Sequence, residues 1–457
     1  FRRVLFRSTH VVQHPLVQVP ADLGFLTPEG KITVFSDQIS MLALAACHMA
    51  ARTPEAPTGD TKAIRFGTLV TENGAPVRDA VVVIRGDKVV SVGSGDSAVP
   101  RGASVTDLRA FTGIPGLVDV HTHMTYYWDG APGTCAFGPN NTRRTPAELA
   151  VAAMVNAKLT LETGVTTVRD LGASNYVDIM MRDRINRGEI PGPTIYASGP
   201  FIQHAAYPGT EYFRWGVNGA EDARAKVRKL AEGKVDLVKL IDQDEMTMDE
   251  LRAVVDEAHK HKLPVIAHAH RPEEIRRGLA VGVDDFEHTG LATAWEYPAD
   301  IVQSLRERAA QGNRPPLFWT PTIDVLTNYD VRRDDPEFID DTAWHLGLPD
   351  SIVTDIRHSL DRLDTLSYYR FVPNRKPTLA NKFRQLRESG VRLLIGTDGG
   401  VPANFHGQAT IDEMVTWVRT YGMDPMETIR AATFWPAVAM GVDKQVGTVE
   451  DRKSTRL

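Results

Sequence analysis

The feature that most limits the fold is a regular alternation of short apolar runs with amphipathic stretches after Pro115. The runs have the length of buried β-strands, and the stretches between them repeat apolar residues at helical spacing. Eight such runs occur, at residues 117–120, 165–168, 194–197, 235–240, 265–267, 284–286, 317–319 and 391–395. Eight strands with intervening helices predict an α/β fold of the (β/α)8, TIM-like barrel type rather than an open sheet.

Several of the expected helices have recognisable ends. Helices are predicted over residues 146–163, 220–231, 248–261 and 272–281. Thr247 and Glu250 have the spacing of a capping box ahead of the third helix, and Pro272 stands at the first position of the fourth, where a missing N–H costs nothing. The interval 323–379 is too long for a plain connection, so we expect it to carry extra helices over the mouth of the barrel.

Two segments precede the barrel. Residues 61–114 hold short alternating strands punctuated by turn residues, which predicts a small antiparallel β domain. Residues 1–60 have no sustained period and are predicted to be an unstructured leader. Within it, Met41 to Cys47 (MLALAAC) resembles the lipidation box of a bacterial lipoprotein signal, although a chance Ala/Leu run is the competing interpretation. A genuine signal would make the protein periplasmic or lipid-anchored, and otherwise we expect it to be cytoplasmic.

Composition excludes several classes of function. With 52 Lys and Arg against 58 Asp and Glu, the chain is mildly acidic and has no basic runs, which argues against a nucleic-acid or membrane-surface protein. No stretch approaches the roughly 20 apolar residues of a membrane span. The two cysteines cannot build a thiolate zinc site, so any metal must be held by His and carboxylates. A small-molecule substrate is therefore expected, and a homo-oligomer is left open.

Polar side chains gather at the ends of the runs, which is where a barrel carries its chemistry. His121 and His123 follow the first run and point the same way, as residues i and i+2 of a strand do. Lys239 lies in the fourth run, where a buried ammonium would be costly. The later runs end in His268 and His270, in Glu287 and His288, and in Asp398. Each residue alone is typical of a hydrogen-bonded strand end, but the set in strand order predicts a metal site.

These motifs resemble the amidohydrolase superfamily, specifically its binuclear-metal branch of imidazolonepropionase-like and Xaa-Pro dipeptidase-like hydrolases. The resemblance extends from about Ile64 to Val449. It is carried by residues 115–123, 164–172, 238–240, 268, 287–288, 396–398, 404–407 and 431–437.

The resemblance implies two divalent metal ions with six protein ligands. His121, His123 and Asp398 would hold the first ion, His268 and His288 the second, and a CO2-derived carbamate on Lys239 would bridge them. An ammonium has no lone pair, whereas a carbamate offers two anionic oxygens suited to cations about 3.5–4 Å apart. Burial would also lower the pKa of the lysine and supply the neutral amine that CO2 needs. Nitrogen and oxygen ligands suit Zn2+ and would also accept Co2+, Mn2+ or Fe2+.

The expected reaction is hydrolysis of an amide C–N bond, most simply in a dipeptide or an N-acyl amino acid. A hydroxide bridging the two metals would attack the carbonyl, with Asp398 as general base and then general acid. A mononuclear deaminase or cyclic amidase is the second interpretation, because His270 and Glu273 mimic a His-x-x-Glu motif, but it leaves Lys239 unexplained. A non-catalytic barrel scaffold is the third.

Further residues are weaker candidates for substrate contacts, and a structural role in a loop competes for each. They are His204 and Tyr212 after the third run, His270 and Arg271 after the fifth, and His406 after the eighth. The guanidinium of Arg271 could clamp a substrate carboxylate. Tyr126, Tyr127 and Trp128 could line a pocket for an apolar or aromatic group.

The C-terminal segment completes the predicted domain organisation. In the family that the chain resembles, strands that return after the barrel complete the β domain, following a stretch like Gly447 to Glu450. Because seven residues follow Glu450, we expect a truncated return and an incomplete β-sandwich domain. The predicted domains are the leader (1–60), the small β domain (61–114), the metal-dependent hydrolase barrel (115–437) and the truncated return (438–457).

Overall fold

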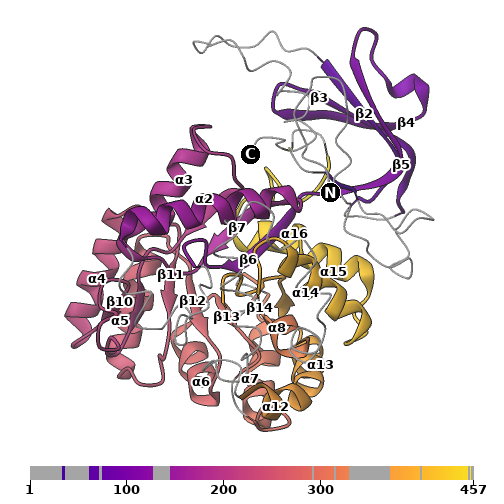
Figure 1. Ribbon diagram of the computed structural model, residues 1–457. Helices are drawn as coiled ribbons and strands as arrows, with labels where there is room; N and C mark the ends of the chain where they lie inside the picture. Colours follow the sequence, from indigo (N-terminus) through magenta and orange to yellow (C-terminus); the bar gives the residue numbers. More distant parts are fainter. Residues whose placement is uncertain are drawn as a thin grey trace. The chain divides into compact units, whose positions relative to one another are not determined.

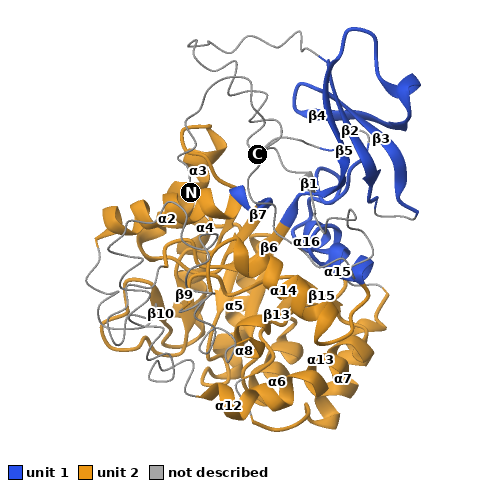
Figure 2. Ribbon diagram, turned by 45° about the vertical axis from the view of Figure 1, so that its right-hand side comes forward, with its two compact units in different colours: residues 1–117, 162–166, 425–457 blue, residues 118–161, 167–424 orange. Residues whose placement is uncertain are grey.

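The computed structural model describes residues 33–35, 61–71, 75–126, 145–290, 293–312, 315–328, 371–401, 404–450 and 453. The chain divides into two compact units, coloured separately in Figure 2. Unit 1 comprises Phe1–Leu117, Glu162–Thr166 and Pro425–Leu457, and unit 2 comprises Val118–Leu161 and Thr167–Asp424. The domain boundaries given above stay predictions. The signal-like residues 41–47, Tyr127 and Trp128 lie outside the described residues.

Unit 1 is built on a five-stranded sheet of order β1-β5-β2-β3-β4 (Figure 1). Its strands are β1 (Thr33–Phe35), β2 (Thr61–Leu69), β3 (Val77–Arg85), β4 (Lys88–Ser94) and β5 (Ser104–Pro115). The antiparallel prediction is confirmed for β2, β3 and β4. It is wrong for β5, which pairs in parallel with β2 and with β1. After β4 the chain crosses to the other side of β2 instead of forming another hairpin, and that crossing makes the pairing parallel.

The core of this sheet is apolar. Alternate residues of β2 and β3, including Phe66 and Val82, pack in one buried cluster, as the two-residue period of a strand requires. Val449 belongs to the same cluster, and the backbone N–H of Val89 donates to the carbonyl of Lys453 at 3.0 Å. The segment after helices α15 (Pro425–Ala431) and α16 (Phe434–Ala439) therefore packs with the β strands of unit 1.

Parallel strands carry the rest of the fold. They form a seven-stranded sheet of order β10-β9-β11-β12-β13-β14-β15 and a three-stranded sheet of order β6-β7-β8. The strands are β6 (Leu117–Thr122), β7 (Val165–Asp170), β8 (Thr194–Ala197), β9 (Phe201–Gln203), β10 (Arg214–Gly216), β11 (Val238–Leu240), β12 (Val265–His268), β13 (Asp285–Glu287), β14 (Phe318–Thr320) and β15 (Arg392–Leu393). Each of the eight predicted runs overlaps one of them. Strands β9 and β10 were not predicted.

Backbone hydrogen bonds also join the ends of the two parallel sheets. The N–H of Val120 donates to the carbonyl of Ile395 at 3.0 Å, next to β6 and β15. The N–H of Asp236 donates to the carbonyl of Ala197 at 2.8 Å, ahead of β11 and at the end of β8.

Helices alternate with these strands and lie outside them in Figure 1. They are α2 (Pro146–Glu162), α3 (Val177–Asn186), α4 (Ala220–Glu232), α5 (Met248–Lys260), α6 (Pro272–Val281), α7 (Ala299–Ala309), α8 (Asp324–Thr327), α12 (Val372–Arg375), α13 (Leu379–Ser389) and α14 (Gln408–Arg419). The capping box of Thr247 and Glu250 is present at the start of α5, and Pro272 opens α6, as predicted. The described part of the interval 323–379 contains α8 and α12. Among the helices described, none combines the length and the apolarity needed to cross a bilayer.

Candidate metal centre

The ends of the parallel strands bring the predicted ligands of unit 2 together. Strand register aligns three of these strands, because Lys239 on β11 pairs with Ile266 on β12, and His268 pairs with Glu287 on β13. An isolated parallel bridge between Thr122 and Gly399 places the segment after β15 beside the end of β6. Side chains far apart in the sequence therefore converge at one edge of the strands.

The first group consists of His121, His123 and Asp398, all buried. One carboxylate oxygen of Asp398, Oδ1, lies 3.1 Å from Nε2 of His123 and 3.5 Å from Nε2 of His121. Asp398 has a φ of 61°, in the left-handed region that few non-glycine residues adopt. Two imidazole nitrogens and a carboxylate oxygen in this arrangement are a donor set that suits a divalent cation.

The second group consists of His268, His270 and His288. The rings of His268 and His288 are 4.8 Å apart at 81°, so their in-plane lone pairs can converge on one ion. The ring of His270 is stacked on that of His288, with centroids 4.3 Å apart and planes at 13°. The ring of His268 is also 4.7 Å from that of His270, at 73°, so the lone pair of His268 can converge with that of either His270 or His288.

The amine of Lys239 interacts electrostatically with both groups. Its side chain is fully buried, and its Nζ makes no hydrogen bond within the described part of the chain. Burial lowers the pKa of Lys239 to about 8. Its charge in turn lowers the pKa of His121 and of His268, one residue of each group. A buried ammonium without an acceptor is unfavourable. A carbamate at this position would instead offer anionic oxygens to the two cation sites.

Four imidazoles of the site are uncharged at neutral pH. Burial, as the largest cause, lowers the pKa of His121, His268, His270 and His288 well below the usual range of histidine. A metal ligand must offer a lone pair, so a neutral imidazole is the form that can bind. The protonation state of the cluster therefore fits metal ligation.

Asp119 forms hydrogen bonds that hold the first group in place. It accepts hydrogen bonds from the backbone N–H of His121 (3.1 Å) and from the hydroxyls of Thr397 and Thr410 (both 2.8 Å). Burial raises the pKa of Asp119 to about 6. The sequence analysis did not single out this residue. Its signal was an acidic residue two positions before His121 in an otherwise apolar strand.

Glu287 was also missed, although it forms part of a recognised motif. Its Oε2 lies 2.6 Å from Nδ1 of His121, and its Oε1 accepts a hydrogen bond of 2.6 Å from Arg169. The same guanidinium nitrogen donates to Asp285 at 2.6 Å. Burial, and then the neighbouring charge of Asp285, raise the pKa of Glu287 to about 8.

Comparison with known proteins places the chain in a family. Residues 112–454 match the model of the Amidohydrolase family. The chain belongs to the amidohydrolase family. It is therefore an enzyme, as the strand-end motifs predicted.

Individual relatives agree with this assignment. The amidohydrolase is 24% identical to ochratoxinase of Aspergillus niger over 421 residues, which cover 83% of this chain and 76% of the relative. Among solved structures it is similar to a Xaa-Pro dipeptidase with bound methionine, with a TM-score of 0.67, 24% identity and coverage of 86% of this chain and 92% of that chain. It is also similar to molinate hydrolase, with a TM-score of 0.66, 21% identity and coverage of 87% and 88%. These structural likenesses confirm the α/β fold type.

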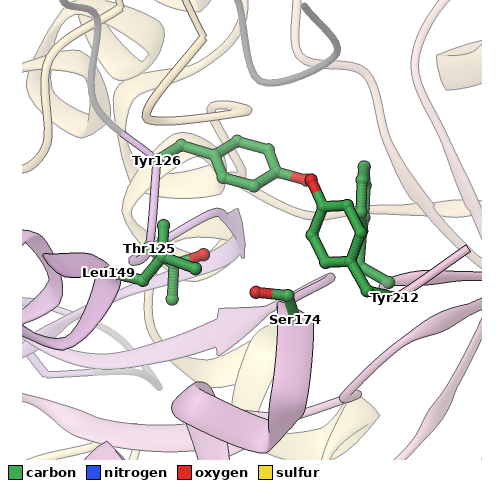
Figure 3. Close-up of a pocket in the computed structure, with 6 residues that line it drawn as sticks. Thr125, Tyr126, Leu149, Ser174 and Tyr212 are labelled. Atoms are coloured by element: carbon green, nitrogen blue, oxygen red, sulfur yellow. The ribbon is translucent and has the colours of Figure 1, made fainter. Parts of the chain in front are cut away.

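A small pocket of the amidohydrolase lies next to the first group. It is lined by Thr125, Tyr126, Leu149, Ser174, Tyr212 and Phe213. Figure 3 shows the side chains of Tyr126 and Tyr212 pointing toward one another across it. The ring of Tyr126 stacks on His123 at a centroid distance of 4.4 Å. Tyr126 and Tyr212, which we call the aromatic wall, therefore line this pocket beside His123 of the candidate metal centre.

The other predicted contacts are placed differently. His204 is exposed, and its Nδ1 lies 3.7 Å from a carboxylate oxygen of Glu250. His406 is buried, with Nε2 3.4 Å from the carbonyl of Tyr126, and burial lowers the pKa of His406 to about 4. His406 therefore lies near the pocket, whereas His204 lies on the surface.

The structure places Arg271 among protein carboxylates, and its role as a clamp for a substrate carboxylate stays a prediction. Its Nη2 donates to Asp242 at 2.8 Å, to Asp244 at 2.7 Å and to Glu274 at 3.2 Å. Three protein carboxylates share this guanidinium nitrogen and connect Arg271 to the loop after β11 and to α6. Sequence reasoning missed these partners because two of them lie in the preceding loop.

Proposed function

We propose that this amidohydrolase is a two-metal hydrolase that cleaves the amide bond of a dipeptide or an N-acyl amino acid. The observation that carries the proposal is the buried amine of Lys239, which has no hydrogen bond in the described part of the chain and acts on both groups of neutral imidazoles. In the same proposal the eight predicted strands, which are β6, β7, β8 and β11 to β15, form one closed barrel, supported by the hydrogen bonds that join the two parallel sheets.

The proposed histidine and aspartate ligands are drawn from the two groups of side chains described above. His121, His123 and Asp398 would hold the first ion, His268 and His288 the second, and the carbamate of Lys239 would bridge them. All six donors are nitrogen or oxygen, the set that suits Zn2+. Two such ions would lower the pKa of a water molecule and polarise the carbonyl of the substrate.

Lys239 can form the carbamate because burial lowers its pKa. A primary amine reacts with CO2 only when neutral, and the reaction forms an N–C bond and releases one proton. With a pKa of about 8, Lys239 is neutral in a useful fraction of molecules near neutral pH. The carbamate is an anion, which the surrounding cations would stabilise. Its formation also removes the unpaired ammonium.

Asp398 is the proposed proton carrier. Its Oδ1 lies within 3.5 Å of two imidazole nitrogens and therefore faces the reaction centre. Oδ1 would accept the proton of the attacking water and then transfer it to the leaving nitrogen of the amide. The aromatic wall of Tyr126 and Tyr212 supports an apolar group on the substrate next to His123.

Metal content and product analysis test this function together. The full chain, purified with Zn2+ and bicarbonate, should contain two metal ions by mass spectrometry and hydrolyse members of a panel of dipeptides and N-acyl amino acids. One ion with ammonia as the product would instead support the mononuclear deaminase. The position of Glu273 disfavours that alternative, because its carboxylate is half exposed and binds Arg277 at 2.8 Å. A chain that binds no metal would refute the hydrolase mechanism.

A further inference from the structure

We propose that Trp319 is a positioning residue, whose indole N–H holds the backbone of His288 in the conformation that directs its imidazole toward the second ion. The inference rests on the proposed function, since it concerns how one ligand of that ion is prepared. It involves an indole N–H, which can only donate, and a backbone carbonyl, which can only accept. It is therefore independent of the protonation state of any residue.

The backbone of His288 has an unusual conformation. His288 directly follows β13 and has a φ of 76°, in the left-handed region that few non-glycine residues adopt. For a residue with a β-carbon this conformation costs free energy and persists only where the surrounding structure fixes it. In this conformation the ring centroid of His288 lies 4.8 Å from that of His121 and 4.8 Å from that of His268.

The neighbouring strand β14 fixes the peptide groups on both sides of His288. The N–H of His288 donates to the carbonyl of Thr320 at 2.7 Å. The carbonyl of His288 accepts from Nε1 of Trp319 at 2.7 Å. The two strands are in parallel register, with Glu287 beside Thr320. One hydrogen bond on each side of the residue restrains both φ and ψ, and the second of these bonds comes from a side chain.

The indole of Trp319 is itself held by packing. Its side chain is fully buried, so water does not compete for its hydrogen bond. Its ring packs against Phe286 and Tyr297, at centroid distances of 5.1 and 5.8 Å. A side chain packed in this way keeps its rotamer, and the N–H stays directed at the carbonyl of His288. Without the N–H, this buried carbonyl loses its donor, and the backbone of His288 can relax out of the left-handed region.

A ligand of the first group provides the contrast. Asp398 also has a positive φ, but its carbonyl accepts from the backbone N–H of Val401 at 3.2 Å. A substitution of a side chain does not remove a backbone donor. We therefore expect the ion at His288 to depend on Trp319 and the ion at Asp398 to be independent of it.

The first variant that tests the idea is Trp319→Phe, which keeps an aromatic ring and removes the N–H. We expect equilibrium dialysis against Zn2+ to show about 10- to 100-fold weaker binding of one ion and unchanged binding of the other. In the Co2+-substituted protein, the visible absorption of one ion should be weakened. The ion affected should be the one that a His268→Ala variant also loses.

Trp417→Phe is the matched control. Trp417 on α14 is also fully buried, and its Nε1 donates to Glu413 at 2.7 Å, so its acceptor is not a candidate ligand. Each variant removes one buried indole hydrogen bond and the same side-chain volume, and we expect similar losses of stability in urea. Trp417→Phe should bind both ions like the wild type. Wild-type affinity for both ions in Trp319→Phe, or equal loss of affinity in both variants, would overturn the proposal.

A second replacement at position 319 separates the hydrogen bond from the packing of the ring. In 3-benzothienylalanine a sulfur atom stands where the indole has its N–H, and the shape of the side chain is kept. With this residue in place of Trp319, we expect the same loss of one ion as in Trp319→Phe. Wild-type binding of both ions would show that packing alone positions His288, against the proposal.

A measurement on the metal-free wild-type protein covers the case in which neither variant binds metal or folds well. In protein with 15N-labelled tryptophan, NMR should show that the indole N–H of Trp319 exchanges slowly with deuterium, because it is buried and hydrogen-bonded. Rapid exchange of this N–H would contradict the inference. Because this spectrum needs no metal, it separates a failure of the role of Trp319 from a failure of the proposed function, which would appear as a wild-type chain that binds no metal.

Discussion

The sheet of unit 1 and the strand ends of unit 2 are buried to a similar degree but with opposite chemistry. In unit 1 the buried positions of β2 and β3 are aliphatic or aromatic, as at Phe66, Val82 and Ile84. At the strand ends of unit 2 they are imidazoles, carboxylates and the amine of Lys239. Burying apolar surface stabilises a fold by about 25 cal/mol per Å2, whereas burying ionisable groups costs free energy unless they are well paired. The comparison indicates that unit 1 buries side chains for stability and that unit 2 buries them for chemistry.

Lys239→Met gives the sharpest test of that contrast. Methionine keeps much of the length of the side chain and removes the amine, so the proposed bridge between the ions cannot form. We expect kcat/KM to fall about 1000-fold or more, since both the bridging ligand and one ion are lost. Thermal stability of the metal-free protein should stay the same or rise, because a desolvated amine disappears from the interior. An active variant would exclude Lys239 from the centre.

Asp398→Asn should separate proton transfer from metal binding. The amide keeps an oxygen at the position of Oδ1 but cannot accept the proton of the attacking water. We expect kcat to fall about 100- to 10,000-fold while mass spectrometry still finds metal in the protein. Turnover close to the wild-type rate would remove Asp398 from the role of general base.

Ile84→Ala perturbs the apolar core of unit 1. It deletes buried methyl groups from the cluster that contains Phe66 and Val82. We expect a loss of about 2–5 kcal/mol of stability in the urea-induced unfolding of unit 1, with kcat/KM of the folded fraction unchanged. If kcat/KM falls strongly although all molecules are folded, the apolar core of unit 1 and the candidate site of unit 2 are not independent.

Glu413→Gln tests a buried carboxylate of unit 2 that is not a candidate ligand. Burial, and then the charge of Asp324, raise the pKa of Glu413 from 4.5 to about 8. Between these values the folded state keeps a proton that the unfolded state releases, so wild-type stability falls as pH rises from 4.5 to 8. Glutamine does not titrate. The stability of the wild type relative to the variant should therefore decrease by on the order of 2 kcal/mol between pH 5 and pH 7, measured by urea unfolding. A difference that is constant with pH would contradict the raised pKa.

The part of the site that the sequence predicts is the part set by local pattern. His121 and His123 follow an apolar run, and Lys239 interrupts one, so strand periodicity alone aligns them. The hydrogen bonds around His121 could not be predicted in this way, because Arg169 and Glu287 are 118 residues apart, on β7 of one parallel sheet and on β13 of the other. Arg271 shows what residue type alone leaves out. Its residue type suits a carboxylate ligand, but Asp242 and Asp244 of another loop occupy its guanidinium.

The smallest effect is expected for His204→Ala, and it distinguishes exposed from buried histidines. The side chain of His204 is 45% exposed, and its neighbour is Glu250 at 3.7 Å, a surface pair worth little free energy. We expect kcat/KM within about twofold of wild type, because an exposed pair of this kind contributes at most about 1 kcal/mol. His270→Ala is the matched comparison, since that imidazole is stacked on His288. It should lower kcat/KM clearly more than His204→Ala. The reverse order would mean that the loop of His204 moves onto the substrate, and burial would then no longer separate functional from structural histidines in this enzyme.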